Sequence, residues 1–165
     1  MRYPNGFSLM ELMVVVAVIF ILLAVAIPGM RAMIIHANET SAVASIRAIN
    51  TAEASYQVTY GGYAESLGQL GGAEPCKKSA ETACLLDESL AGGEKSGYRF
   101  VAVGGNASGG LNTSYLASAA PDVFDRTGKR IFCSTDRGVI RTDQNAGGST
   151  MPPTAEQCTA FPALK

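Results

Sequence analysis

A glycine, an aromatic residue and a carboxylate stand near the start of the chain at a spacing that could do chemistry. Gly6 is followed by Phe7, and Glu11 lies four residues after Phe7. If the chain were cut after Gly6, Phe7 would carry a new α-amino group about one helical turn from the Glu11 carboxylate. The amine of one copy could then meet the carboxylate of a neighbour, because any other stagger leaves both charges unpaired in apolar surroundings. If the chain is cut there, such a pair would set the register of a helical assembly.

The segment that holds these residues is long and apolar. No residue from Leu12 to Ile27 carries a polar side chain. A helix over Phe7 to Ile27 would reach roughly 31 Å, which matches the hydrocarbon core of a bilayer. A secretory signal peptide has a shorter apolar core of about 7–15 residues and fits poorly. We therefore expect residues 7–29 to form a transmembrane helix, and a plain signal anchor with Arg2 on the cytoplasmic side remains an alternative.

A charge inside such a span requires a reason. An acidic residue deep in a bilayer costs about 2.5–3.5 kcal/mol on insertion scales, so it usually has a partner. Taken alone, Glu11 could be an interfacial carboxylate that reaches the lipid headgroups. A paired amine at Phe7 explains its position better.

The same helix is expected to continue beyond the apolar run. Pro28 lacks a backbone N–H and, with Gly29, predicts a kink. Residues 31–60 contain neither proline nor glycine, and Gly61 with Gly62 predicts the end of the helix. Apolar side chains recur at helical spacing and predict one face packed on a head; they are Ile46, Ile49, Ala52, Tyr56 and Tyr60.

The segment from Gly6 to Glu11, followed by the apolar run and Pro28, resembles the class III leader and N-terminal helix of type IV pilins and pseudopilins. The resemblance is close over roughly the first sixty residues. It implies that a prepilin peptidase cuts between Gly6 and Phe7 and that Phe7 is N-methylated. It also implies that Glu11 assists assembly into a helical filament with the apolar helices at its centre.

The resemblance implies partners and places as well. The partners are further copies of the chain, the prepilin peptidase and the inner-membrane pilus assembly machinery. The precursor would lie in the bacterial inner membrane, and the assembled filament outside the cell, or in the periplasm for a pseudopilin.

Composition separates the first part of the chain from the rest. The 165 residues allow one domain plus an anchor. The 13 basic and 14 acidic residues nearly cancel, so no basic field indicates nucleic-acid binding. Sixteen of the 18 glycines and all four cysteines follow Tyr60. We expect a leader at 1–6, a transmembrane and filament-core helix at 7–29, its amphipathic continuation at 30–60 and a globular head at 61–165.

The head is expected to be α+β, with the long N-terminal helix packed against a small antiparallel β-sheet. Alternating and β-branched residues predict strands, and the turn at 136–138 predicts a hairpin. The family resemblance makes residues 61–97 a variable loop joining helix to sheet, and the tail 142–165 is expected on the surface without regular structure. The predicted strands cover residues 98–103, 114–118, 130–133 and 139–141.

The four cysteines are expected to form two disulfides, because the head would face outward. Three pairings are possible. We favour Cys76 with Cys84, which would brace the variable loop, and Cys133 with Cys158, which would tie the tail to a strand. A zinc site is the alternative, but the spacings contain no C-x-x-C and no nearby histidine.

No enzyme activity, metal or cofactor is indicated. His36 lies a turn before Glu39, but a solvated or interface residue explains this histidine better than a general base. Arg126, Lys129 and Arg130 form a basic cluster that neighbouring aspartates dilute, so a solvated loop is expected rather than a nucleic-acid contact.

Three functions stay open. The first is a structural subunit of a type IV pilus, serving adhesion, surface motility or DNA uptake. The second is a pseudopilin of a type II secretion system; these relatives tend to be shorter, usually lack disulfides and hold calcium with acidic loop residues. The third, a monomeric anchored domain, would not need Phe7 and Glu11 at this spacing.

Overall fold

The structure, a computed structural model, describes residues 7–72 and 75–164, without the side chains of residues 25–29. It divides into two compact units, Met1–Ile34 and Ile35–Lys165. Helix α1, Leu9–Tyr60, contributes to both. Among the described residues, no helix has a stretch that is long and apolar enough to cross a membrane.

Helix α1 ends where the sequence predicts. Gly61 has a φ of +86°, and its N–H donates to the Gln57 carbonyl over 2.8 Å. A glycine in this left-handed conformation is the usual helix terminator, because it has no Cβ to strain. The predicted kink at Pro28 and Gly29 falls on residues whose side chains lie outside the described part of the chain, and it stays a prediction.

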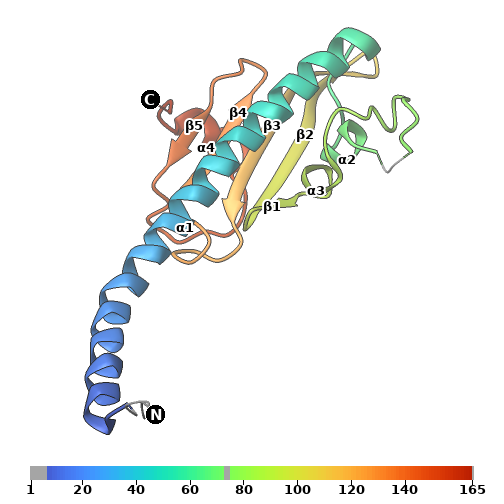
Figure 1. Cartoon of the computed structure of the whole chain (residues 1–165). Helices are drawn as coiled ribbons and strands as arrows, with labels where there is room; N and C mark the ends of the chain where they lie inside the picture. Colours follow the sequence, from blue (N-terminus) through green and yellow to red (C-terminus); the bar gives the residue numbers. More distant parts are fainter. Residues whose placement is uncertain (1–6, 73–74, 165) are drawn as a thin grey trace. The chain divides into compact units, whose positions relative to one another are not determined.

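The second unit contains one antiparallel sheet in the order β1-β2-β3-β4-β5 (Figure 1). The long hairpin of β2 and β3 pairs Tyr98 with Pro121 at one end and Ser108 with Leu111 at the other. The five strands are β1 Glu94–Lys95, β2 Tyr98–Ser108, β3 Leu111–Pro121, β4 Ile131–Thr135 and β5 Arg141–Asp143.

The core of this unit forms where α1 packs against one face of the sheet. Along β2 buried and less buried residues alternate, as expected for a strand with one covered face. The helix contributes Ile46, Ile49 and Ala52, which are at most 4% exposed. From the sheet come Tyr98, Phe100, Ala102, Tyr115, Ala117, Ala119 and Phe132. The predicted α+β fold, a long helix against an antiparallel sheet, is confirmed.

Two sequence predictions were wrong in detail. The last strand was expected at 139–141, whereas β5 covers Arg141–Asp143, because the turn at Gly138 is followed by residues outside the ladder. The tail was expected to lack regular structure, but it contains the end of β5 and helix α4, Ala155–Ala160. Thr154 caps α4 by accepting from the Gln157 N–H, and the Gln157 side chain accepts from the Thr154 N–H.

The segment predicted as a variable loop also holds short elements. Helix α2 covers Leu67–Leu70 and helix α3 covers Glu88–Ala91, with β1 after it. Asp87 caps α3 by accepting from the Leu90 N–H over 3.0 Å. Leu70 and Leu90 are 0% and 1% exposed, so apolar burial holds both helices to the head.

Candidate assembly site at the start of the first helix

Helix α1 begins with a reciprocal cap made by Ser8 and Glu11. The Ser8 Oγ accepts from the Met10 N–H over 3.3 Å, and the Ser8 N–H donates to Glu11 Oε2 over 3.4 Å. A serine at the N-cap with a glutamate three residues later is the sequence pattern of a capping box. Glu11 is thus held beside Phe7 by its own helix.

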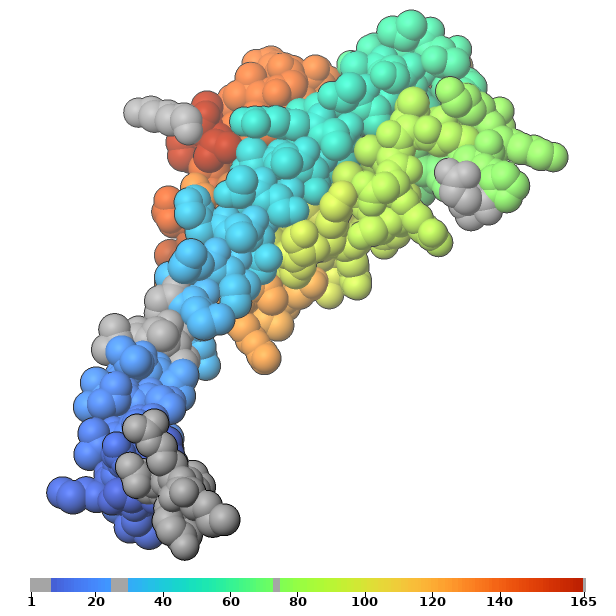
Figure 2. All heavy atoms as spheres, viewed as in Figure 1, coloured from blue at the N-terminus to red at the C-terminus, as the bar shows by residue number. Residues whose placement is uncertain are grey.

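The first helical turns expose their apolar side chains to an unusual degree. In the described residues of the first unit, fourteen large apolar side chains between Phe7 and Leu23 are 41–82% exposed. These residues belong to the blue segment in Figure 2. Soluble monomers rarely expose contiguous apolar patches larger than a few hundred Å². This surface needs a cover, which a bilayer or neighbouring copies could supply.

Glu11 is the one ionisable side chain among residues 7–24. It lines a shallow surface groove with Ser8, Met10, Val14 and Val15. A carboxylate in such a groove can accept a cation from a neighbouring molecule, provided the surrounding apolar side chains become covered. Gly6, the residue before the expected cut, lies outside the described residues. Of the three predicted site residues at this end of the chain, the structure therefore describes Phe7 and Glu11.

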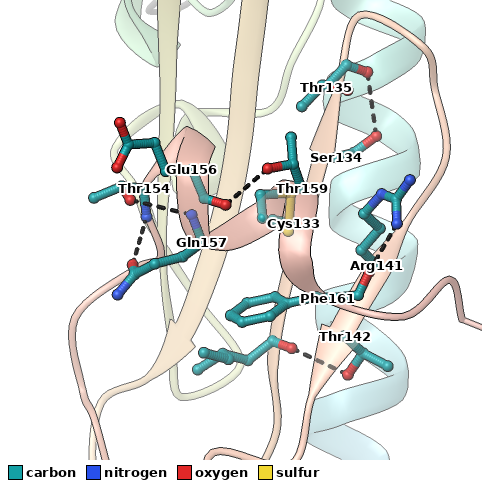
Figure 3. The surroundings of a disulfide bond; sticks show 12 residues. Cys133, Ser134, Thr135, Arg141, Thr142, Thr154, Glu156, Gln157, Thr159 and Phe161 are labelled. Carbon is teal, nitrogen blue, oxygen red and sulfur yellow. Dashed lines mark hydrogen bonds between the residues drawn. A yellow bond between two sulfur atoms is a disulfide. The ribbon is translucent and has the colours of Figure 1, made fainter.

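The four cysteines form two disulfides in the second unit. Cys76 is joined to Cys84, and Cys133 on β4 is joined to Cys158 on α4. These are the pairings favoured from the sequence. Around the second disulfide, the Arg141 Nη1 donates to the Phe161 carbonyl over 2.7 Å, so β5 also holds the tail (Figure 3).

Glu39 points to the loop before β4 rather than to His36. Its Oε1 accepts from the N–H groups of Lys129 and Arg130 at 3.0 and 3.1 Å, and its Oε2 pairs with the Arg130 guanidinium at 2.8 Å. Burial alone would raise the pKa of the Glu39 carboxyl, but these hydrogen bonds and the Arg130 charge hold that pKa below its ordinary value.

The predicted basic cluster is therefore divided between two ion pairs. Arg130 pairs with Glu39, and Lys129 pairs with Asp125 at 2.8 Å. Both cations have a carboxylate within salt-bridge distance, which leaves Arg126 as the cluster member without one among the described residues. The described residues also contain no group of three or more His, Cys, Asp or Glu side chains that could hold a metal ion.

Three polar residues of structural importance were missed from the sequence. Ser8 could have been found from its serine-to-glutamate spacing to Glu11. Glu53 lies four residues after Ile49 and three before Tyr56, on the apolar stripe, and it is fully buried. Its Oε2 accepts from the Ala64 N–H over 3.0 Å. The third is Glu39, which the sequence analysis names beside His36 but whose buried contacts it missed, because the partners Lys129 and Arg130 lie about 90 residues away.

The comparisons with known proteins bear on the same end of the chain. The family described as the prokaryotic N-terminal methylation motif matches residues 1–27. The comparisons with curated proteins and with solved structures give no match. The matched residues include Gly6, Phe7 and Glu11. The first 27 residues therefore carry the N-terminal methylation motif, the class III prepilin leader region that type IV pilins and pseudopilins share.

Proposed function

We propose that this chain is a structural subunit of a type IV pilus that polymerises through its first helix. The observation that carries the proposal is the methylation motif over residues 1–27 on a helix whose apolar side chains are exposed. The filament would serve adhesion, surface motility or DNA uptake. The chain needs no catalytic role for this function.

Assembly would use the amine that cleavage creates. Once a prepilin peptidase cuts between Gly6 and Phe7 and methylates the new terminus, the Phe7 amine remains a cation. Glu11 holds the Ser8 N–H over a long 3.4 Å contact and keeps a second carboxylate oxygen, Oε1, for a neighbour. Pairing the Phe7 amine of one copy with Glu11 of the next would fix the stagger between helices, because both charges become buried together.

Helix burial would supply most of the association energy. Where apolar surface leaves lipid, tight packing between the helices stabilises the association. Where it leaves water, each Å² that becomes buried contributes about 25 cal/mol as well. The exposed side chains of the first unit offer a continuous surface for this contact. The inner-membrane assembly machinery would be needed to extract each subunit from the membrane.

The two disulfides support a pilus over a secretion pseudopilin. Pseudopilins of type II secretion systems usually lack disulfides, whereas two of them brace the small head of this chain. Both belong to the second unit, where they tie the segment after α2 and the tail. The pseudopilin of a type II secretion system remains the competing function.

The test replaces the assembly carboxylate and compares filaments. In Glu11→Gln the shape is retained and the charge is lost. We expect processing and membrane insertion to be unchanged, while sheared filaments fall by more than about tenfold, because truncating a buried charge pair costs about 2–5 kcal/mol. Glu156→Gln is the matched control, since Glu156 is an exposed carboxylate on α4.

Two results would decide against the proposal. Normal filaments from Glu11→Gln would show that the charge pair does not direct assembly. Wild-type chain that is processed yet stays in the periplasm, with none in the sheared fraction, would assign the chain to secretion instead.

A further inference from the structure

A cleft with aromatic walls lies at the end of α1 in the second unit, apart from the assembly residues. It has a volume of about 250 Å³, and its lining includes Tyr56, Tyr60, Tyr63, Leu111 and Asn112. In Figure 1 the turn between β2 and β3 lies behind the last turn of α1, and Tyr63 forms a bridge with Asn112. The proposed filament function makes no use of this cleft.

The aromatic walls are held in place by their neighbours. The rings of Tyr56 and Tyr60 have centroids 4.6 Å apart, and the Tyr56 hydroxyl donates to the Ala80 carbonyl over 2.7 Å. Tyr63 contacts Tyr115 with centroids 4.8 Å apart. The buried Glu53 anchors the next residue of the loop through the Ala64 N–H. The cleft is therefore formed before any ligand arrives, which lowers the entropic cost of binding.

The polar atoms at the cleft include both donors and acceptors. Gln69 Oε1 accepts from the Glu65 N–H over 2.7 Å, so the Gln69 amide NH₂ group is left to donate to another acceptor. Asn112 Nδ2 donates to the Tyr63 carbonyl over 3.2 Å, so its Oδ1 stays an acceptor. Among the described residues, the exposed Glu65 carboxylate forms no ion pair. Amide and hydroxyl donors and several acceptors thus line the cleft together with the half-exposed rings of Tyr60 and Tyr63.

We propose that this cleft binds a single sugar ring of a carbohydrate. A sugar presents C–H groups that pack on an aromatic face and hydroxyls that each donate and accept, which matches this set of atoms. Among the described residues, no lysine, arginine or histidine lines the cleft, so the cleft offers an anion no cationic side chain. The volume lies just below the roughly 300–1,000 Å³ of sites for drug-sized ligands, which suits a single ring.

The experiment uses the full-length chain in a polyoxyethylene detergent, which carries neither sugar nor ammonium groups. The probes are the methyl glycosides of glucose, galactose and N-acetylglucosamine, with choline as the cationic competitor. Saturation-transfer NMR detects binding, and tyrosine fluorescence gives the Kd, since the chain has six tyrosines and no tryptophan. We expect a Kd of about 1–10 mM for at least one glycoside, typical of a single small contact.

Two variants and one control connect the binding to the cleft. Tyr60→Leu keeps an apolar side chain and should raise the Kd about fivefold through loss of the aromatic face. Glu65→Gln, on an exposed side chain, should raise it as well without affecting folding. Gln57→Ala, also exposed near the end of α1 but absent from the cleft lining, should leave the Kd unchanged.

Three outcomes would overturn the inference. These are the absence of any glycoside signal at tens of millimolar, an unchanged Kd in both Tyr60→Leu and Glu65→Gln, and binding of choline without binding of any glycoside. The last would assign the cleft to a cation, because tyrosine rings and a carboxylate also attract ammonium groups. Since the readout is independent of filaments, its failure is distinct from failure of the assembly proposal.

Discussion

Glu53 shows how a single buried carboxyl can set the pH dependence of the head. It is fully buried, one of its oxygens accepts from Ala64, and Oε1 has no hydrogen-bond partner among the described residues. Burial raises the pKa of the Glu53 carboxyl from 4.5 to about 7, although the Ala64 N–H opposes the shift. The folded state therefore binds a proton that the unfolded chain releases at lower pH.

We predict that Glu53 makes the head less stable as pH rises from about 4.5 through 7. A raised folded-state pKa contributes stability that is complete below the unfolded pKa and is lost as pH passes the folded pKa. The loss amounts to about 3 kcal/mol, from about 1.4 kcal/mol per pKa unit. Urea unfolding of wild type and Glu53→Gln at pH 5, 6, 7 and 8 measures it.

Glu53→Gln should flatten this dependence, since the amide does not titrate. The comparison cancels other groups that titrate in the same range. Glu39 acts in a different pH range. The lowered pKa of its carboxyl contributes stability that is complete above the ordinary pKa of a glutamate and is lost as pH falls through the lowered pKa. Parallel curves for wild type and Glu53→Gln between pH 5 and 8 would mean that the Glu53 carboxyl keeps an ordinary pKa.

At the scale of elements, the two disulfides differ in how much chain they restrain. Cys133–Cys158 closes a separation of 25 residues and fixes α4 to β4, whereas Cys76–Cys84 closes one of 8. In the chain-entropy description these loops correspond to about 3.5 and about 2.5 kcal/mol. The residues that follow α4 are also held to β5, where Arg141 donates to the Phe161 carbonyl and the Thr142 N–H donates to the Pro162 carbonyl.

We therefore predict that removing the longer disulfide has the greater effect. Cys133→Ser with Cys158→Ser should lower the unfolding free energy by about 3 kcal/mol or more and speed hydrogen exchange across Ala155–Ala160. Cys76→Ser with Cys84→Ser is the matched control and should leave exchange in α4 unchanged. Equal exchange in α4 for the two double variants would show that the disulfide does not hold that helix.

Local signals predicted some elements from the sequence and missed others. The helix stop at Gly61 and the strand alternation from Tyr98 depend on neighbouring residues, so both could be read directly. Helix α4 also had a local signal, the Thr154 and Gln157 capping pair, but its six residues are too short for a periodic pattern. The position of β5 depends on its pairing of Ile131 with Asp143, which no local pattern encodes.

The functional residues also differ in whether the sequence reveals them. The spacing of Gly6, Phe7 and Glu11 is a local pattern and was available from the sequence. The ion pair of Glu39 with Arg130 and the anchoring of Ala64 by Glu53 join segments that meet through tertiary packing alone. Composition and periodicity do not reveal the partners in such buried polar contacts, because those partners lie on other segments of the chain.

At the scale of the whole molecule, the two units differ in what their surfaces require. The second unit buries its own core between α1 and the sheet and is braced by both disulfides. The first unit exposes apolar side chains along its helix. In the proposed filament, neighbouring copies would cover the exposed side chains of the first unit. A polymer of many copies satisfies both requirements.

The most direct measurement is the intact mass and N-terminal sequence of filaments sheared from cells that make this protein. We predict a chain that begins at N-methyl-Phe7 and is lighter than its reduced form by two hydrogens for each of its two disulfides. That single mass would show cleavage after Gly6, methylation and export together. A chain that still begins at Met1, or that is absent from sheared material, would contradict the account.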